Sequence, residues 1–63
     1  MVKLLDAGHG DESIPVALWW TDAQTLQFVQ LLDGGIGEIR TVTGRGEYSP
    51  SLVREALRLA AAE

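Results

Sequence analysis

The sequence predicts an α/β fold of the α+β type, a small mixed three-stranded sheet with two helices in the order strand, strand, helix, strand, helix. Residues 14–20 alternate with a period of two, the stretch after Thr21 carries helix-start signals, and residues 50–62 form an alanine-rich amphipathic pattern. A chain of 63 residues has room for one hydrophobic core. We therefore expect a single domain over residues 1–63.

The first two strands are predicted from short apolar runs on either side of a polar loop. Residues 2–5 are mainly apolar and are followed by Asp6 and a glycine-rich loop. Residues 14–20 place four large apolar side chains on one face, namely Ile14, Val16, Leu18 and Trp20. The loop between the runs is long enough for the chain to turn back, which favours antiparallel pairing of these strands.

A helix over residues 22–33 is predicted from its end signals. Thr21 can cap the helix through its hydroxyl, and Gln24 falls where a capping box needs it. Asp22 suits the first turn of a helix, and Gly34 suits the residue after its end. A broad apolar arc would then face the core, formed by Leu26, Phe28, Val29, Leu31 and Leu32.

A single long helix over residues 15–33 is the alternative to a strand followed by a helix. A short apolar run does not distinguish the two by its period. The long helix would place Thr21 in its interior and leave the capping box without a role. We therefore prefer the strand followed by the helix.

The second half predicts a third strand and a final helix. Residues 38–43 are rich in β-branched side chains, with a bulge expected near Gly37. A tight turn follows, after which Glu47 and Tyr48 are expected to pair back briefly. Ser49 and the following proline then mark the start of a helix over residues 50–62. A right-handed crossover would set the second and third strands parallel. The sequence does not determine which face of the sheet the final helix covers.

Composition favours a small acidic protein that self-associates. The net charge is −4, which argues against binding to nucleic acid through a cationic surface. The chain has no cysteine and one histidine, so disulfides and a structural zinc site are not expected as stabilisers. Because the core of so short a chain is marginal, we expect a homodimer. No apolar run is long enough to cross a membrane, and we expect a cytoplasmic location without membrane contact.

Residues 2–10, VKLLDAGHG, resemble the start of zinc-dependent N-acetylmuramoyl-L-alanine amidases, in which an Asp-x-Gly-His-Gly signature carries a metal-ligating histidine. This resemblance nominates His9 as a metal ligand and covers about nine residues. Asp11 stands where that family usually has another glycine, and the chain has no second histidine to complete the ligand set. We therefore predict no metal, no cofactor and no enzymatic activity.

The leading hypothesis is a non-enzymatic protein-interaction or regulatory module. Neighbouring residues in a strand point to opposite faces, so Trp19 turns away from the face of Trp20. If both helices cover one face, Trp19 and Ala17 form an exposed patch, which is typical of an interface with a protein partner or a second copy. The alternative is a nucleic-acid-binding module that uses an arginine patch for an anionic partner, formed by Arg40, Arg45, Arg54 and Arg58.

Overall fold

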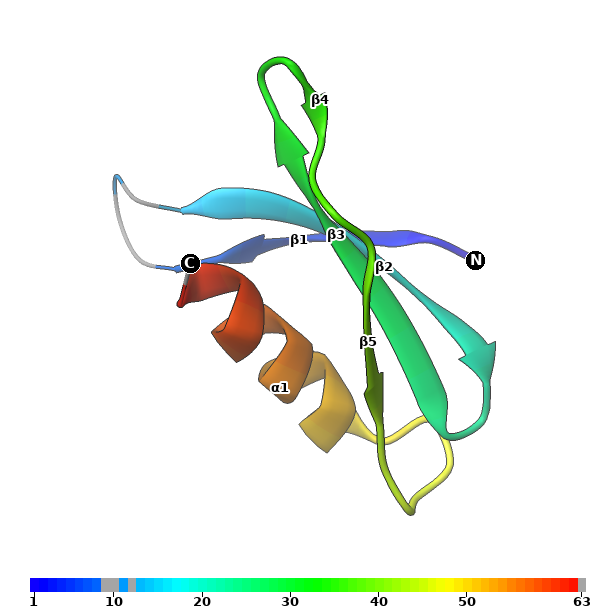
Figure 1. Cartoon of the computed structure of the whole chain (residues 1–63). Helices are drawn as coiled ribbons and strands as arrows, with labels where there is room; N and C mark the ends of the chain where they lie inside the picture. Colours follow the sequence, from blue (N-terminus) through cyan, green and yellow to red (C-terminus); the bar gives the residue numbers. More distant parts are fainter. Residues whose placement is uncertain (9–10, 12, 63) are drawn as a thin grey trace.

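The chain folds into an antiparallel sheet with one helix packed on one of its faces (Figure 1). The computed structural model describes residues 1–8, 11 and 13–62. In these residues the elements are β1 (Lys3–Ala7), β2 (Ile14–Asp22), β3 (Thr25–Leu32), β4 (Gly35–Ile36), β5 (Arg40–Thr43) and α1 (Pro50–Ala61). The mixed α+β class is confirmed, whereas three strands with two helices is wrong.

The first hairpin matches the prediction from the sequence. β1 and β2 pair antiparallel without interruption, from Lys3 opposite Leu18 to Ala7 opposite Ile14. The alternation in β2 places Val16 and Leu18 on the face that α1 covers. Both predicted strands and their antiparallel pairing are confirmed.

The predicted helix over residues 22–33 is wrong, and so is the single long helix, because this segment is the central strand β3. A two-residue turn joins β2 to β3, with Asp22 opposite Thr25. The Asp22 carboxylate accepts a hydrogen bond from the Gln24 backbone N–H at 2.8 Å, which stabilises the turn in the place of a helix cap. Thr21 lies in β2 at a bulge, and its hydroxyl donates weakly to the Thr25 carbonyl at 3.4 Å.

The chain returns along the far edge of β3 in two pieces. β4 pairs with the end of β3, and β5 pairs with its beginning, both antiparallel. Leu31 faces Ile36 while Phe28 faces Arg40, so the register shifts by one residue between the two pieces, as a bulge near Gly37 predicts. The third strand is confirmed, but its predicted parallel pairing with β2 is wrong. Tyr48 lies in a loop and not in a hairpin strand.

The predicted final helix is confirmed as α1. The Ser49 hydroxyl accepts from the Ser51 N–H at 3.2 Å, and Pro50 occupies the first turn. At the other end, the Gln30 amide donates to the Ala60 carbonyl at 2.7 Å. Arg40 donates to the Leu59 carbonyl at 3.5 Å. These two sheet side chains bond to carbonyl groups in the last turn of the helix, where the Leu59 carbonyl also accepts from the Ala62 N–H.

The core lies between α1 and one face of the sheet. The largest fully buried side chains come from the two central strands, namely Val16, Leu18, Leu26 and Phe28. Small residues on α1 let the helix approach them closely, because Ala56 and Ala60 are fully buried beside Leu52. The helix thus covers the face of the sheet that carries these residues. The opposite face of the sheet is left as the surface to consider for function.

Candidate functional site

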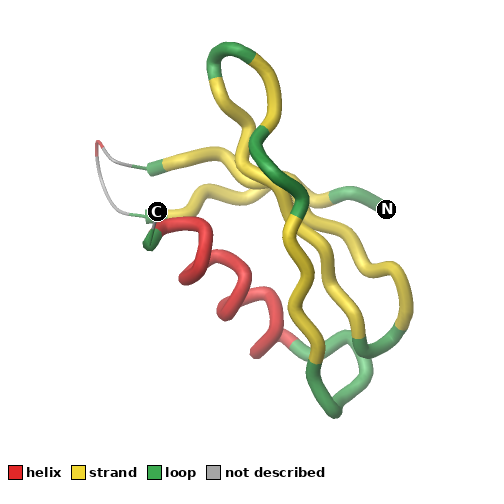
Figure 2. The backbone as a smooth tube through the Cα atoms, viewed as in Figure 1, coloured by secondary structure: helices red, strands yellow, loops and turns green. Residues whose placement is uncertain are grey.

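The face of the sheet turned away from α1 is the candidate site, and we call it the open face. Figure 2 shows the helix on one side of the sheet, and no element in the described part of the chain covers the other side. Strand register assigns its members, because directly opposed residues share a face. They are Leu4, Asp6, Pro15, Ala17, Trp19, Thr25, Gln27, Val29, Leu31, Ile36, Thr41 and Thr43.

A chain of hydrogen bonds crosses the open face from β2 to β5. The Trp19 indole N–H donates to the Gln27 side-chain oxygen at 3.1 Å. The Gln27 amide in turn donates to the Thr41 hydroxyl at 3.4 Å. These contacts hold the indole of Trp19 down on the sheet instead of leaving it extended into solvent. The open face therefore presents Trp19 in a fixed position, which lowers the entropy lost when a partner packs on it.

The open face has a buried centre and an exposed apolar margin. Ala17 and Val29, which lie opposite each other, are only 8% and 4% exposed. Leu4 at one edge is 68% exposed and Ile36 at the other end is 64% exposed. Ala17, Val29 and the half-buried Leu31 join these two exposed side chains into one apolar band across the face, and this band is the candidate interaction surface.

Sequence reasoning identified two members of the open face and missed the rest. Trp19 and Ala17 both lie on it, Trp19 half-buried and Ala17 buried. Val29 and Leu31 were missed because they were assigned to the apolar arc of a helix. The alternation of Gln27, Val29 and Leu31 with Leu26 and Phe28 is the signal that could have placed them on this face.

The four arginines do not share one surface. Arg40, on β5, lies 5.3 Å from the centre of the Phe28 ring and also contacts the end of α1. Arg54 and Arg58 lie on the opposite flank of α1, beside β1, where they line a groove of about 380 Å³. Arg45 lies in the loop before α1, where its carbonyl accepts from Gln24 at 3.1 Å.

Arg58 is engaged within its own helix. Its guanidinium pairs with the Glu55 carboxylate through two hydrogen bonds on the solvent side of α1. The hydrogen bond and the charge of Arg58 lower the pKa of Glu55, and Glu55 raises the pKa of Arg58. An anionic partner at this position would compete with Glu55. The nucleic-acid hypothesis thus stays a prediction, carried by arginines that the fold separates.

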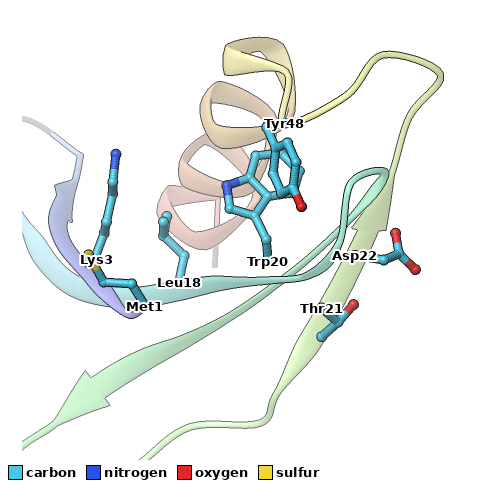
Figure 3. Close-up of a pocket in the computed structure, with 7 residues that line it drawn as sticks. All are labelled: Met1, Lys3, Leu18, Trp20, Thr21, Asp22 and Tyr48. Atoms are coloured by element: carbon cyan, nitrogen blue, oxygen red, sulfur yellow. The ribbon is translucent and has the colours of Figure 1, made fainter.

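A second hollow lies on the helix side of the sheet, near the loop that leads into α1. It has a volume of about 300 Å³ and is lined by Met1, Lys3, Leu18, Trp20, Thr21, Asp22 and Tyr48 (Figure 3). The Trp20 and Tyr48 rings meet edge to face, with centroids 5.3 Å apart. Tyr48 holds a left-handed backbone conformation with φ of 49°, and its N–H donates to the Ala23 carbonyl at 2.6 Å. This contact fixes the aromatic ring over Trp20.

The predicted absence of a metal concerns residues that the structure covers only in part. His9 lies outside the described residues. Within the described residues, no three acidic, histidine or cysteine side chains come together in a group that could hold an ion. No helix in this part of the chain is both long enough and apolar enough to span a membrane. Comparison with family models, with curated proteins and with solved structures gives no match for this chain.

Proposed function

We propose that the chain is a small, non-enzymatic, cytoplasmic interaction module that binds an amphipathic helix of a protein partner on its open face. The observation that carries the proposal is the one-sided cover of the sheet. α1 packs on one face through small and apolar residues, while the open face keeps Leu4 and Ile36 exposed around a buried apolar centre. A sheet buries both faces most completely when helices cover each of them.

Charge supports a partner helix with basic flanks. The chain carries a net charge of −4, and Asp6, at one edge of the open face, is the charged residue among its members. An apolar stripe can dock on the apolar centre of the face while Asp6 stays at the edge, where a basic residue of the partner helix would pair with it. Basic residues beside that stripe would be attracted to the acidic chain and would raise the association rate.

The proposal is tested with a designed 18-residue helical peptide of leucine and lysine, titrated into the isotopically labelled protein. We expect the largest changes in backbone amide chemical shift in the NMR spectrum on the open face, around Ala17, Val29 and Leu31. The amide signals of α1 should not change. Largest shifts on the helix side of the sheet, or on the acidic loops alone, would contradict the proposal.

A matched pair of variants separates apolar docking from general attraction between charges. Ile36→Ser removes an exposed side chain from the open face, and Leu32→Ser removes a similarly exposed one from the other side of the sheet. Neither substitution changes the net charge. Burial of one such side chain is worth about 1.5 kcal/mol, so Ile36→Ser should weaken peptide binding about tenfold. Leu32→Ser should leave it unchanged, and equal effects of the two would point to non-specific binding.

A further inference from the structure

We propose that two copies of the chain pair antiparallel through β1, about a two-fold axis that passes beside Leu4. This pairing would join two sheets into one and would place their open faces side by side. The self-association expected from the sequence is thereby assigned to β1 and not to Trp19. The pairing stands on its own observations, and only the use of the joined surface rests on the proposed function.

β1 is a short edge strand that carries Lys3 and Asp6 but lacks the proline and the bulge that block edge pairing most directly. It pairs with β2 along one side, and no strand in the described residues pairs with its other side. Its register with β2 is unbroken, and it contains neither proline nor bulge. Edge strands that avoid association carry one of these features, are covered, or bear charged side chains, and of these β1 has only Lys3 and Asp6. The backbone groups on the outer side of β1 are therefore open to another strand.

The exposed apolar residues concentrate at the same edge. Met1, Val2, Leu4 and Leu5 are all exposed, and they form half of the large apolar side chains exposed in the described chain. A second β1 would cover this run along its whole length. An apolar strand with few charges is therefore a better neighbour for this edge than solvent is.

A second copy of β1 is such a strand, and one register of the two copies aligns their apolar and charged residues without conflict. With the axis beside Leu4, Leu4 faces its own copy, Lys3 faces Leu5, and Val2 faces Asp6. No two like charges are directly opposed, although like charges opposite each other are the usual barrier to pairing. This register also uses every residue from Met1 to Ala7, whereas an axis beside Leu5 would leave Met1 and Val2 without partners within the strand.

The groove between β1 and α1 supports the same register. It opens beside Ala7 and has apolar walls from Leu57 and Ala61, with Arg54 and Arg58 at its border. Pairing about Leu4 sets the partner's Met1 opposite Ala7, on the side of the sheet that carries α1. A flexible methionine side chain suits an irregular apolar groove of this kind.

The consequence of the pairing is a doubled binding surface. In an antiparallel pair with equivalent residues opposed, the axis is perpendicular to the sheet, so both open faces lie on the same side. Leu4 is on the open face and would stand at the centre of the joined surface. The dimer would then offer two adjacent docking sites for partner helices, with the two copies of α1 on the reverse side.

Single cysteines test the pairing directly, because the natural chain has none and any disulfide must join two copies. Directly opposed residues have Cα atoms about 4.5–5.5 Å apart, within the range that a disulfide spans. Leu4→Cys should therefore form a linked dimer rapidly. A mixture of Lys3→Cys and Leu5→Cys should form the mixed dimer in preference to either homodimer. Thr43→Cys, an exposed position on the other edge strand, is the matched control and should cross-link slowly.

The outcomes separate the possible arrangements. Cross-linking of Leu4→Cys no faster than Thr43→Cys, or fastest cross-linking by Leu5→Cys alone, would overturn the proposed pairing. Two open faces stacked on each other would link Leu4→Cys and Trp19→Cys but not the mixture of Lys3→Cys and Leu5→Cys, because those two side chains point to the helix side. That result would also overturn it.

Charged variants provide a second measurement that needs no oxidation. Leu4→Lys and Leu4→Glu each place like charges opposite each other at the axis, so each should sediment as a monomer. An equal mixture of the two should restore the dimer, because lysine then faces glutamate. Failure of the mixture to associate would contradict the register. Ile36→Ser should remain dimeric while binding the peptide about tenfold more weakly, so failure of the edge pairing and failure of the proposed function give different results.

Discussion

Trp19 and Trp20 are neighbours in β2, and the fold gives them different environments. Trp20 packs against the core and against the ring of Tyr48, whereas Trp19 lies on the open face with its N–H bonded to Gln27. We expect Trp20→Ala to lower the free energy of unfolding by about 3 kcal/mol, the lower end for a core aromatic, because Trp20 is only partly buried. Trp19→Ala should cost less, about 2 kcal/mol, because it removes one hydrogen bond and the packing of a half-buried indole on the open face.

Urea denaturation followed by circular dichroism measures both tryptophan variants. A domain of this size has a total stability of about 5 kcal/mol, so the Trp20 variant should keep only about 2 kcal/mol and unfold at a much lower urea concentration. The Trp19 variant should keep the spectrum of the parent protein and remain dimeric in sedimentation. Equal losses for the two would mean that both faces of the sheet are covered.

Tyr48 allows the cost of a backbone conformation to be separated from the value of a ring contact. Tyr48→Ala and Tyr48→Gly both remove the contact with Trp20, and they differ in how well the residue tolerates a φ of 49°. A residue with a Cβ loses about 1–2 kcal/mol in the left-handed region, which glycine avoids. We expect the free energy of unfolding of the glycine variant to be about 1 kcal/mol higher than that of the alanine variant. An alanine variant as stable as the glycine variant would show that the loop relaxes once the ring is removed.

At the scale of the element, the β2–β3 turn depends on Asp22 and not on Thr21. The Asp22 carboxylate accepts a short hydrogen bond from Gln24, while the Thr21 hydroxyl makes only a long one. We expect Asp22→Ala to cost about 1 kcal/mol and Thr21→Ala about half of that or less. The melting temperatures of the two variants check this order. A larger loss for Thr21→Ala would be the result expected for a helix cap, and it would contradict the hairpin.

The segment that sequence reasoning misassigned shows where local patterns fail. β3 is apolar on both faces, with Leu26 and Phe28 towards α1 and Val29 and Leu31 on the open face. A strand of this kind lacks simple alternation, and its apolar residues can be drawn as an arc on a helix. The outer hairpin and α1 were predicted correctly because β2 alternates and Ser49 with Pro50 gives a clear helix start.

At the scale of the molecule, the residues that share the candidate site are set by which strands pair. Short sequence patterns do not show that pairing. β5 pairs with β3, and α1 follows β5 in the chain. The face that α1 covers can therefore be predicted only once β3 is known to be a strand. The four arginines were expected to form a single patch because they lie in the predicted third strand, in the turn after it and on the final helix, which follow one another in the chain. In the fold, Arg40 lies on β5 and Arg54 lies on the flank of α1 beside β1. Sequence proximity to α1 therefore did not predict a common surface.

Net charge should control the association of two copies. Each copy carries −4, so the copies repel each other at low ionic strength, and salt reduces this repulsion. We expect the dimer to strengthen as sodium chloride rises from about 20 to 200 mM, a range over which the screening length falls severalfold. The melting temperature should also rise with protein concentration. Analytical ultracentrifugation and calorimetry at several dilutions measure both effects, and a melting temperature independent of dilution would exclude a stabilising dimer.

The position of α1 after all the strands has a consequence for how the protein is made. The sheet is assembled by neighbouring hairpins, so its strand pairs join residues that are close in the sequence and can form early in folding. Its core face nevertheless waits for Leu52, Ala56 and Ala60, which are translated afterwards. Until α1 docks, both faces of the sheet and the β1 edge are exposed on one chain. Chaperone contact at that stage is therefore expected to affect how much of the newly made chain reaches its folded state.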